Sequence, residues 1–257
     1  MLKLNIVKIG GAIIEQEAKL LPFLQGFAAL KGPKILVHGG GKRATAWADK
    51  LGIPVQMKDG RRVTDAATLE LITGLYAGQV NKNIVAHLQG MNCNALGLSG
   101  ADANAIQAVK RPVKAIDYGF VGDVKRVNNR WFKHLLGQNI SPVCCAITHD
   151  KNGQLFNTNA DTITAEIGKA LAQDFEVKIS YCFELPGVMK DINDSNSLIE
   201  KINQASYQQL LLNNTISAGM LPKLHNAFDA LQAGVKEVAI GATNMINQTI
   251  PYTSITL

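Results

Sequence analysis

The sequence predicts an α/β fold in which a mostly parallel sheet is covered by helices on both faces. Short apolar segments alternate with amphipathic segments almost from end to end, a pattern typical of successive strand–helix units. Hydrophobic residues make up 47% of the chain and charged residues 18%, which is ordinary for a globular protein. Neither a Pro/Ser-rich linker nor a repeat of fixed period divides the 257 residues, so we expect one continuous domain.

The expected elements follow one another in a regular order. Strands are predicted at residues 2–9, 34–37, 95–98, 140–146, 176–181 and 237–240. Helical periodicity fills most of the intervals, at residues 15–30, 43–51, 65–88, 131–136, 161–172, 205–212 and 220–233. Turn residues predict hairpins at 55–63, 105–127 and 150–153. The first two hairpins interrupt the alternation of strands and helices, and hairpins inserted in this way often cover a ligand.

Composition argues against several classes of protein. The longest apolar runs are too short to span a membrane, and the chain enters its first strand without a cleavable signal pattern, so we expect a cytoplasmic protein with no membrane partner. The four cysteines form no C-x-x-C pair, which argues against a metal site or disulfides. The formal charge is +6, but no basic cluster carries interleaved aromatic residues, so no nucleic-acid partner is predicted. The excess of positive charge fits equally well a protein that binds a small anion and a basic protein whose charge has no functional role.

A lysine and two glycines end the first predicted strand. Lys8 shares a strand face with Leu4 and Ile6 and lies just before Gly10 and Gly11. Ligands of parallel α/β proteins bind at this edge of the sheet, and glycine N–H groups there can approach an anion closely. One interpretation is a phosphate cradle. The other is a solvated lysine followed by an ordinary turn.

The second predicted strand repeats this arrangement, since it runs into His38 and the glycines at 39–41. Two glycine turns at two strand ends make coincidence a weaker explanation than anion binding. An esterase oxyanion hole also uses an HGGG turn, but its G-x-S-x-G elbow is missing, because the nearest match at 97–101 ends in alanine. His38 is either a general base or, as is commoner at a strand end, a residue that hydrogen-bonds the turn.

Polar candidates follow in a predicted hairpin and at a predicted helix start. Arg61 and Arg62 could clamp a carboxylate or lie in a solvated hairpin tip. Because neighbours on a strand face opposite ways, only one of them is expected to point at a site. Asn157 and Asp161 belong to the segment NTNAD, which fits either a helix start or a binding site.

Lys223 is unusual for its predicted position in the first turn of a helix. A cation there opposes the helix dipole by a few tenths to about 1 kcal/mol, and a bound anion would reverse that effect. Two lysines, two glycine turns and an aspartate describe a phosphoryl-transfer site. Neither the P-loop G-x-x-x-x-G-K-[ST] nor the G-x-G-x-x-G fingerprint is present in the sequence.

This combination resembles the amino-acid kinase family. The resemblance covers nearly the whole chain and rests on eight segments that are weak signals singly and strong in this order. They are KIGG (8–11), VHGGG (37–41), GRRVT (60–64), TGLYAGQVNK (73–82), GLSGAD (97–102), GFVGDV (119–124), NTNAD (157–161) and GMLPK (219–223).

The resemblance implies an αβα sandwich with a lobe at about residues 1–172 for an acylated amino acid and a lobe at about 173–257 for nucleotide. The implied reaction uses ATP, which carries Mg²⁺, to phosphorylate the γ-carboxylate of an N-acyl-L-glutamate in arginine biosynthesis. A carboxylate is already a nucleophile at neutral pH. Positioning and charge neutralisation are therefore sufficient, and no general base is needed.

The resemblance also implies roles for individual residues. Lys8 would stabilise the transferring phosphoryl group from the acceptor side and Lys223 from the leaving-group side, with Asp161 holding both lysines. The implied substrate-binding residues are Gly40, Gly41, Arg62 and Asn157, and the implied phosphate cradle is Gly10 and Gly11. The implied nucleotide-binding residues are Glu184, Gly187, Val188, Met189, Thr215, Ile216 and Ser217. No protein-bound metal is implied.

Two features depart from the family pattern. The segment ELPGVM at 184–189 replaces an Asp-Val-x-Gly turn, and Pro186 removes one backbone donor. The chain starts at the first strand, without the leading helix of the arginine-inhibited hexameric members, which implies a homodimer that is insensitive to arginine.

Several alternatives stay open at this point. The acyl group can be acetyl, succinyl or another. The nearest enzyme alternative is a kinase for carrier-bound aminoadipate. A non-catalytic nucleotide sensor on the same fold is disfavoured, because pure binding does not need two lysines and an aspartate around a transferring phosphoryl group.

Overall fold

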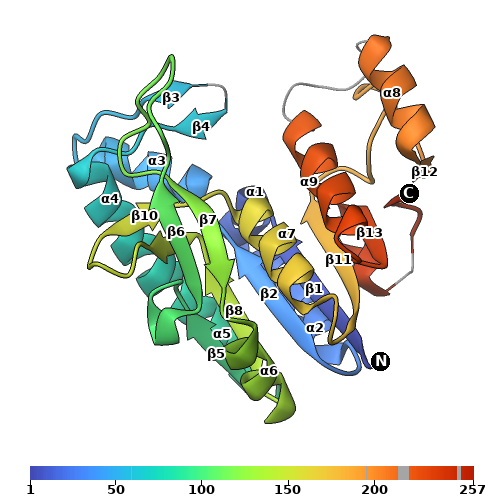
Figure 1. Cartoon of the computed structure of the whole chain (residues 1–257), viewed down its shortest axis with the longest axis horizontal. Coiled ribbons are helices and arrows are strands. Elements are labelled where there is room, and N and C mark those ends of the chain that lie inside the picture. Colours follow the sequence, from blue (N-terminus) through green and yellow to red (C-terminus); the bar gives the residue numbers. More distant parts are fainter. Residues whose placement is uncertain (59, 195, 214–219, 248–249) are drawn as a thin grey trace.

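An eight-stranded sheet forms the centre of the computed structural model, which describes residues 1–58, 60–194, 196–213, 220–247 and 250–257. Its strands are β1 (Lys3–Ile9), β2 (Lys34–His38), β5 (Ala95–Leu98), β8 (Ser141–Cys145), β11 (Glu176–Phe183), β12 (Lys201–Ile202), β13 (Glu237–Ala242) and β14 (Thr253–Ile255). They are arranged in the order β12-β14-β13-β11-β1-β2-β8-β5 (Figure 1). The pairs from β13 to β5 are parallel and β14 is antiparallel to β13. The predicted α/β class with a mostly parallel sheet is confirmed.

All six predicted strands form, with ends within two residues of the expected positions. The sequence missed β12 and β14, because runs of two and three residues are too short to show a strand period. Strand β1 pairs with β11 along its whole length. The sheet is therefore continuous between the N-terminal and C-terminal parts of the chain.

Helices follow the predicted pattern with two differences. Those confirmed are α2 (Glu17–Ala29), α3 (Gly41–Lys50), α6 (Asn129–Gly137), α7 (Ala160–Leu171), α8 (Gln204–Leu212) and α9 (Leu221–Gln232). A five-residue helix α1 (Gly11–Glu15) was not expected. The predicted helix at 65–88 consists of α4 (Ala66–Thr73), a π-helical segment η1 (Gly74–Val80) and α5 (Asn81–Gly90).

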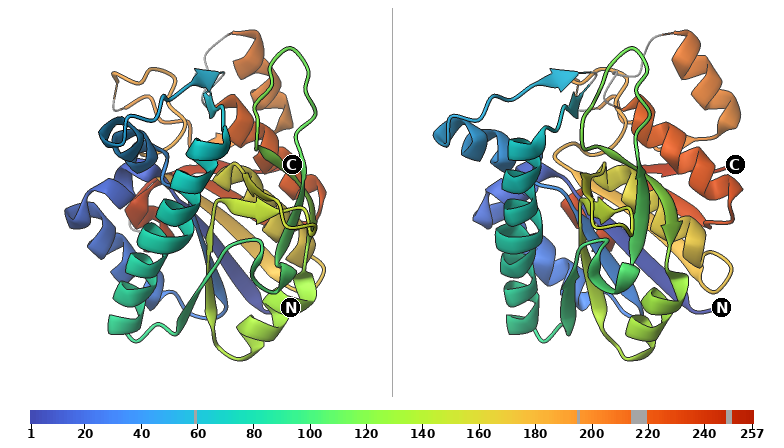
Figure 2. Two further views of the ribbon diagram at one scale, coloured as in Figure 1. Left: turned by 90° about the vertical axis from the view of Figure 1, so that its left-hand side faces the viewer. Right: turned by 60° about the vertical axis from the view of Figure 1, so that its left-hand side comes forward.

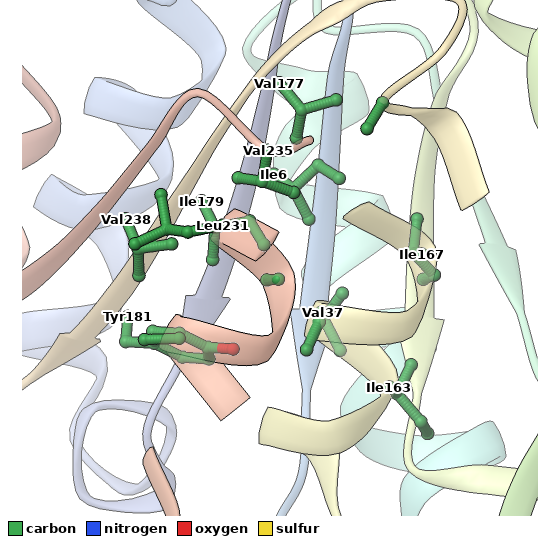
Figure 3. Close-up of a cluster of buried hydrophobic side chains, with 14 of the residues drawn as sticks. Ile6, Val37, Ile163, Ile167, Val177, Ile179, Tyr181, Leu231, Val235 and Val238 are labelled. Carbon is green, nitrogen blue, oxygen red and sulfur yellow. The ribbon is translucent and has the colours of Figure 1, made fainter. Parts of the chain in front are cut away.

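Strand alternation directs side chains into two separate cores. Leu4 and Ile6 of β1 face one core with residues of α7 and α9, shown around Tyr181 in Figure 3. Val7 and Ile9 face the other core with residues of α2 and α5. Burial on both faces is characteristic of parallel strands. Lys8 therefore points to the α7–α9 side, and the next strand directs His38 to the α5 side.

The three predicted hairpins are confirmed. They are β3 (Met57–Lys58) with β4 (Arg61–Arg62), β6 (Ile106–Lys110) with β7 (Gly122–Val127), and β9 (Ile147–His149) with β10 (Leu155–Asn157). Backbone bridges between Thr64 and Gly119 and between Val121 and Asn157 join them. The first two hairpins rise above the carboxyl ends of β1 and β2, opposite α8 and α9 (Figures 1 and 2).

Candidate active site

A cavity of about 410 Å³ lies at the carboxyl ends of β1 and β2. Its wall combines strand ends, glycine turns and the hairpins above them. The polar and glycine residues that line it are Lys8, Gly11, Gly39, Gly40, Gly41, Lys42, Thr45, Gly60, Arg61, Arg62, Tyr76, Arg111, Asn157, Thr158, Asn159 and Asp161. The cavity thus collects five cationic side chains from four separate segments of the chain.

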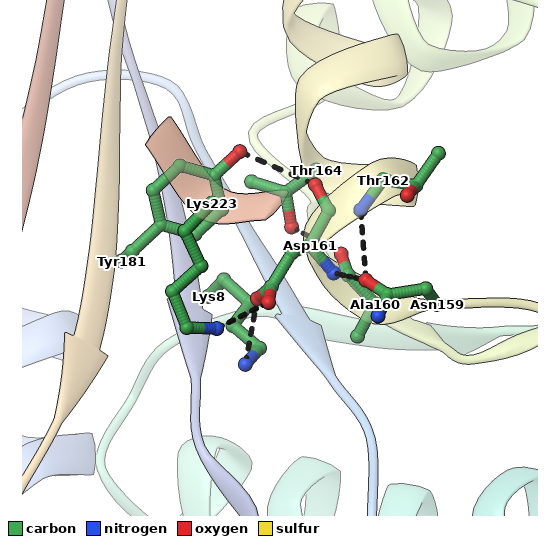
Figure 4. Close-up of polar contacts among 8 residues, drawn as sticks. All are labelled: Lys8, Asn159, Ala160, Asp161, Thr162, Thr164, Tyr181 and Lys223. Atoms are coloured by element: carbon green, nitrogen blue, oxygen red, sulfur yellow. Dashed lines mark hydrogen bonds and ion pairs between the residues drawn. The ribbon is translucent and has the colours of Figure 1, made fainter. Parts of the chain in front are cut away.

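Asp161 binds two lysines that come from different elements (Figure 4). It lies in the first turn of α7, where Asn159 caps the helix by accepting the N–H groups of Asp161 and Thr162 at 2.8 and 3.1 Å. Lys8 of β1 places its Nζ 2.7 Å from Asp161 Oδ1. Lys223, in the first turn of α9, bonds to Oδ2. The structure therefore brings together the three residues that the sequence proposed as catalytic.

The electrostatics of this trio leave one positive charge without a partner. Burial raises the pKa of Asp161, but Lys8 and Lys223 outweigh it and hold the pKa at about 2. Burial lowers the pKa of Lys223, the Lys8 charge lowers it further, and Asp161 opposes both. One carboxylate cannot neutralise two ammonium groups, so an anion beside the trio would be bound favourably.

The two glycine turns contribute differently. Gly10 donates its N–H to the carbonyl of Cys182 at 3.0 Å, so this donor is used within the protein. Gly11 begins α1 and lines the cavity. A Cβ at Gly11 would lie 3.7 Å from the backbone nitrogens of both Gly41 and Lys42. The starts of α1 and α3 therefore meet at the cavity wall, and the absence of side chains leaves their N–H groups accessible.

Tyr76 is a cavity residue to which the sequence assigned no role. A Cβ at Gly40 would lie 2.8 Å from the Tyr76 ring, so this glycine permits direct packing of the ring on the turn. Tyr76 lies in the π-helical segment η1, and such segments are frequent at functional sites. The apolar periodicity of residues 65–88 cannot distinguish a π-helix from an α-helix, so only the TGLYAGQVNK resemblance marked this segment.

Arg62 and Asn157 lie on the same cavity wall. Arg62 is 7% exposed, and its Nη2 donates to the Gly41 carbonyl at 3.0 Å and to Thr45 Oγ1 at 2.7 Å. Asn157 donates from Nδ2 to Thr64 Oγ1 at 3.0 Å. Arg62 is buried and its neighbour Arg61 is exposed, as expected of adjacent residues on a strand, although both are among the residues that line the cavity.

Arg111 adds a cation that sequence reasoning missed. It follows β6, and its Nε and Nη2 donate to Asp123 Oδ1 at 3.0 and 2.5 Å while its guanidinium lies over the Tyr118 ring. The only sequence signal was the expectation that the hairpin at 105–127 covers a ligand. Its carboxylate partner reduces the charge that Arg111 offers to the cavity.

The proposed nucleotide-binding residues lie beyond the end of β11. Glu184 is near Lys19 (3.1 Å) and Lys42 (3.8 Å). Gly187 packs closely against Thr253, since a Cβ at residue 187 would lie 2.4 Å from Thr253 Oγ1. Val188 is 2% exposed, donates its N–H to Thr253 and accepts from Ile199 through its carbonyl.

The remaining proposed nucleotide contacts are only partly described. Met189 pairs with Leu198 across a backbone bridge. Thr215, Ile216 and Ser217 lie outside the described residues. Nucleotide binding by this group of residues therefore stays a prediction.

His38 is fully buried and hydrogen-bonded on both ring nitrogens. Its Nδ1 lies 2.9 Å from the carbonyl oxygen of Gly39, and its Nε2 lies 3.0 Å from Asn81 Nδ2. Burial lowers its pKa to about 4, and the bond to Gly39 opposes this only in part. Of the two sequence interpretations, the hydrogen-bonding one fits this geometry and the general base does not.

The lowered pKa of His38 predicts a specific loss of stability in acid. The unfolded chain binds a proton at this histidine near pH 6.5 and the folded chain only near pH 4, so the stabilisation is complete above pH 6.5 and is lost as the pH falls toward 4. At roughly 1.4 kcal/mol per pKa unit, the loss is about 3 kcal/mol. Urea unfolding measures the free energy of unfolding of the wild type and of His38→Gln from pH 7 to pH 4. The difference between the two proteins should narrow by this amount as the pH falls. A difference that stays constant with pH would contradict the prediction.

The described part of the chain lacks both a metal-binding cluster and a membrane-spanning helix. No group of three or more His, Cys, Asp or Glu side chains in this part of the chain is placed to hold a metal ion. None of its helices is long and apolar enough to cross a membrane.

Comparison with known proteins relates the whole chain to one family. The profile of the amino acid kinase family matches residues 3–242. The Acetylglutamate kinases of Bacteroides fragilis and Cytophaga hutchinsonii are 51% and 54% identical to the chain, over 95% and 93% of its length and 94% and 91% of theirs.

Solved structures share the fold. The crystal structure of smu.665 from Streptococcus mutans has 26% identity and a TM-score of 0.81 and covers 98% of both chains. An N-acetylglutamate synthase from Neisseria gonorrhoeae has 19% identity and a TM-score of 0.82, and the match covers 99% of this chain and 59% of that one. By its sequence, its sheet and the residues gathered at its strand ends, the chain belongs to the amino acid kinase family.

Proposed function

We propose that the protein phosphorylates the γ-carboxylate of N-acetyl-L-glutamate, with ATP as phosphoryl donor, in arginine biosynthesis. Relatives named Acetylglutamate kinase, more than half identical over almost the full length, support this assignment. The observation that carries it is the pairing of Lys8 and Lys223 on Asp161 beside two glycine turns. This arrangement neutralises the charge between two anions, as phosphoryl transfer to a carboxylate requires. It supplies no general base, and this reaction needs none.

The acceptor occupies the 410 Å³ cavity in this proposal. Arg62, with Asn157 beside it, binds the α-carboxylate, since a buried guanidinium suits a planar anion. The γ-carboxylate then lies toward Lys8 and the N–H groups of Gly11 and Gly40. Lys223, from α9, acts on the donor side. Holding the two reactants in line in this way removes much of the entropic part of the barrier.

The nucleotide binds on the side of α9 and the β11 end, where Glu184 and the residues at 187–189 lie. Mg²⁺ bound to ATP supplies further positive charge to the phosphate oxygens. Asp161 is already neutralised by two ammonium groups, so cations and N–H groups face the cavity. This donor set fits a metal that arrives with the nucleotide, and it offers no carboxylate cage for a resident one.

The remaining assignments rest on the family resemblance. We place the acyl-amino-acid lobe at about residues 1–172 and the nucleotide lobe at about 173–257. We assign the protein to the cytoplasm and expect a homodimer.

The proposed function is tested by ADP release in a coupled assay with MgATP. N-acetylglutamate, N-succinylglutamate, glutamate and aspartate are supplied in parallel, and carrier-bound aminoadipate in a fifth reaction. We expect turnover with an N-acylglutamate and none with the free amino acids. Turnover only with the carrier-bound acceptor would favour the aminoadipate kinase, and no turnover with any acceptor would favour the sensor.

A further inference from the structure

The carbonyl of Gly39 is held by a buried imidazole. His38 Nδ1 lies 2.9 Å from this oxygen, and the side chain of His38 is completely shielded from solvent. The carbonyl oxygen of Gly39 and the N–H of Gly40 belong to the same peptide unit. In a trans peptide these two groups point in opposite directions.

The direction of the Gly39 carbonyl therefore decides where the Gly40 N–H points. The carbonyl is turned toward the buried imidazole on the α5 side, so the N–H is turned away from it, toward the cavity that Gly39 and Gly40 line. Within the described part of the chain this N–H has no acceptor. It is thus a free donor, fixed in direction and facing the acceptor cavity.

Asn81 fixes which nitrogen of His38 carries the proton. Its Nδ2 donates to the Val143 carbonyl at 2.9 Å and lies 3.0 Å from His38 Nε2. An amide NH₂ can only donate, so Nε2 must accept, and the proton of the neutral ring must lie on Nδ1. The Val143 carbonyl fixes the orientation of the Asn81 amide. In the flipped orientation, the side-chain oxygen of Asn81 would face the Val143 carbonyl oxygen, and neither atom could donate a hydrogen bond. The Nδ1–H is the donor that holds Gly39.

We propose that His38 and Asn81 are positioning residues that lock the Gly39–Gly40 peptide with its N–H directed at the transferring phosphoryl group. The inference rests on the proposed function, because it gives the Gly40 N–H a reacting anion to bind. It assigns a role to the histidine that the reaction does not use as a base. It also explains why a histidine precedes the glycines, since an apolar side chain would leave this peptide free to flip.

A matched pair of variants tests the lock, because each removes one of the two hydrogen bonds of His38. In His38→Asn the amide nitrogen can replace Nδ1 and donate to Gly39. In His38→Gln the longer side chain can replace Nε2 and accept from Asn81, but Gly39 loses its donor. We expect His38→Asn to keep kcat within about fivefold of wild type and His38→Gln to lose about 100-fold, the effect of losing one oxyanion donor. The KM for N-acetylglutamate should change little in either variant.

A spectroscopic measurement on the wild type keeps the test independent of activity. The ¹⁵N chemical shifts of His38 in the wild type, assigned by their disappearance in His38→Asn, should show the neutral tautomer protonated at Nδ1. Protonation at Nε2 would overturn the proposal, as would equal kcat values for the two variants. If the wild type turns over no acceptor, the proposed function fails, while the tautomer still reports whether the peptide is held.

Discussion

Replacing Lys8 with methionine is expected to lower kcat for ADP release by about 10³-fold, the upper part of the range for loss of one group that stabilises a transition state. Methionine keeps the length of the side chain and removes its charge. The KM for N-acetylglutamate should rise much less, because Arg62 and Asn157 remain. Asp161 keeps its ion pair with Lys223, so folding should survive.

A lysine of the same strand provides the control for this variant. Lys3 is exposed at the opposite end of β1, and Lys3→Met should leave kcat unchanged. Steady-state ADP release with N-acetylglutamate measures both variants, and urea unfolding verifies that both are folded. A Lys8→Met enzyme within tenfold of wild-type kcat would remove Lys8 from the reaction.

Replacing Asp161 with asparagine is expected to lower kcat by about 10²-fold or more and also to destabilise the protein. Lys8 and Lys223 would repel each other without the carboxylate, and loss of one partner of a buried ion pair costs about 3 kcal/mol. Asp161 raises the pKa of Lys223 against burial and the Lys8 charge, so its loss lowers that pKa further. Lys223 would then lose its proton at lower pH, and the alkaline limb of the kcat–pH profile should move to lower pH.

A surface ion pair supplies the control for Asp161→Asn. Asp174 lies 2.5 Å from Lys133, and both side chains are partly exposed, so Asp174→Asn should change the free energy of unfolding by less than about 1 kcal/mol. Its pH profile should match that of the wild type. An alkaline limb that stays in place in Asp161→Asn would show that Lys223 does not titrate in the active enzyme.

Much of the fold could be predicted because its signals are local. Each central strand is a short apolar run, and burial on both faces of a parallel sheet makes such runs continuous and easy to locate. The alternation of side chains along β1 also predicted correctly that Lys8 shares a face with Leu4 and Ile6. The edge strands β12 and β14 were missed, since they are short and take their form from pairing with each other and with β13.

The site could be predicted only in part, because its geometry depends on contacts between distant segments. The glycine turns and Lys8 were recognisable as a possible anion site from strand ends alone. Tyr76 was not assigned to the cavity, since its packing on Gly40 depends on how η1 lies against the turn. The availability of Gly10 was also misjudged, because its N–H is taken by Cys182 of the neighbouring strand.

By itself the sequence determined which residues end the strands, because period, turn chemistry and helix starts are written within a few neighbouring positions. It placed His38 before three glycines without deciding between a base and a structural residue. Only the tertiary structure brought Lys223 to Asp161, which lies 62 residues earlier, and Asn81 to His38, 43 residues earlier. Charge neutralisation and tautomer choice are properties of such pairs, and a pair exists only once the chain has folded.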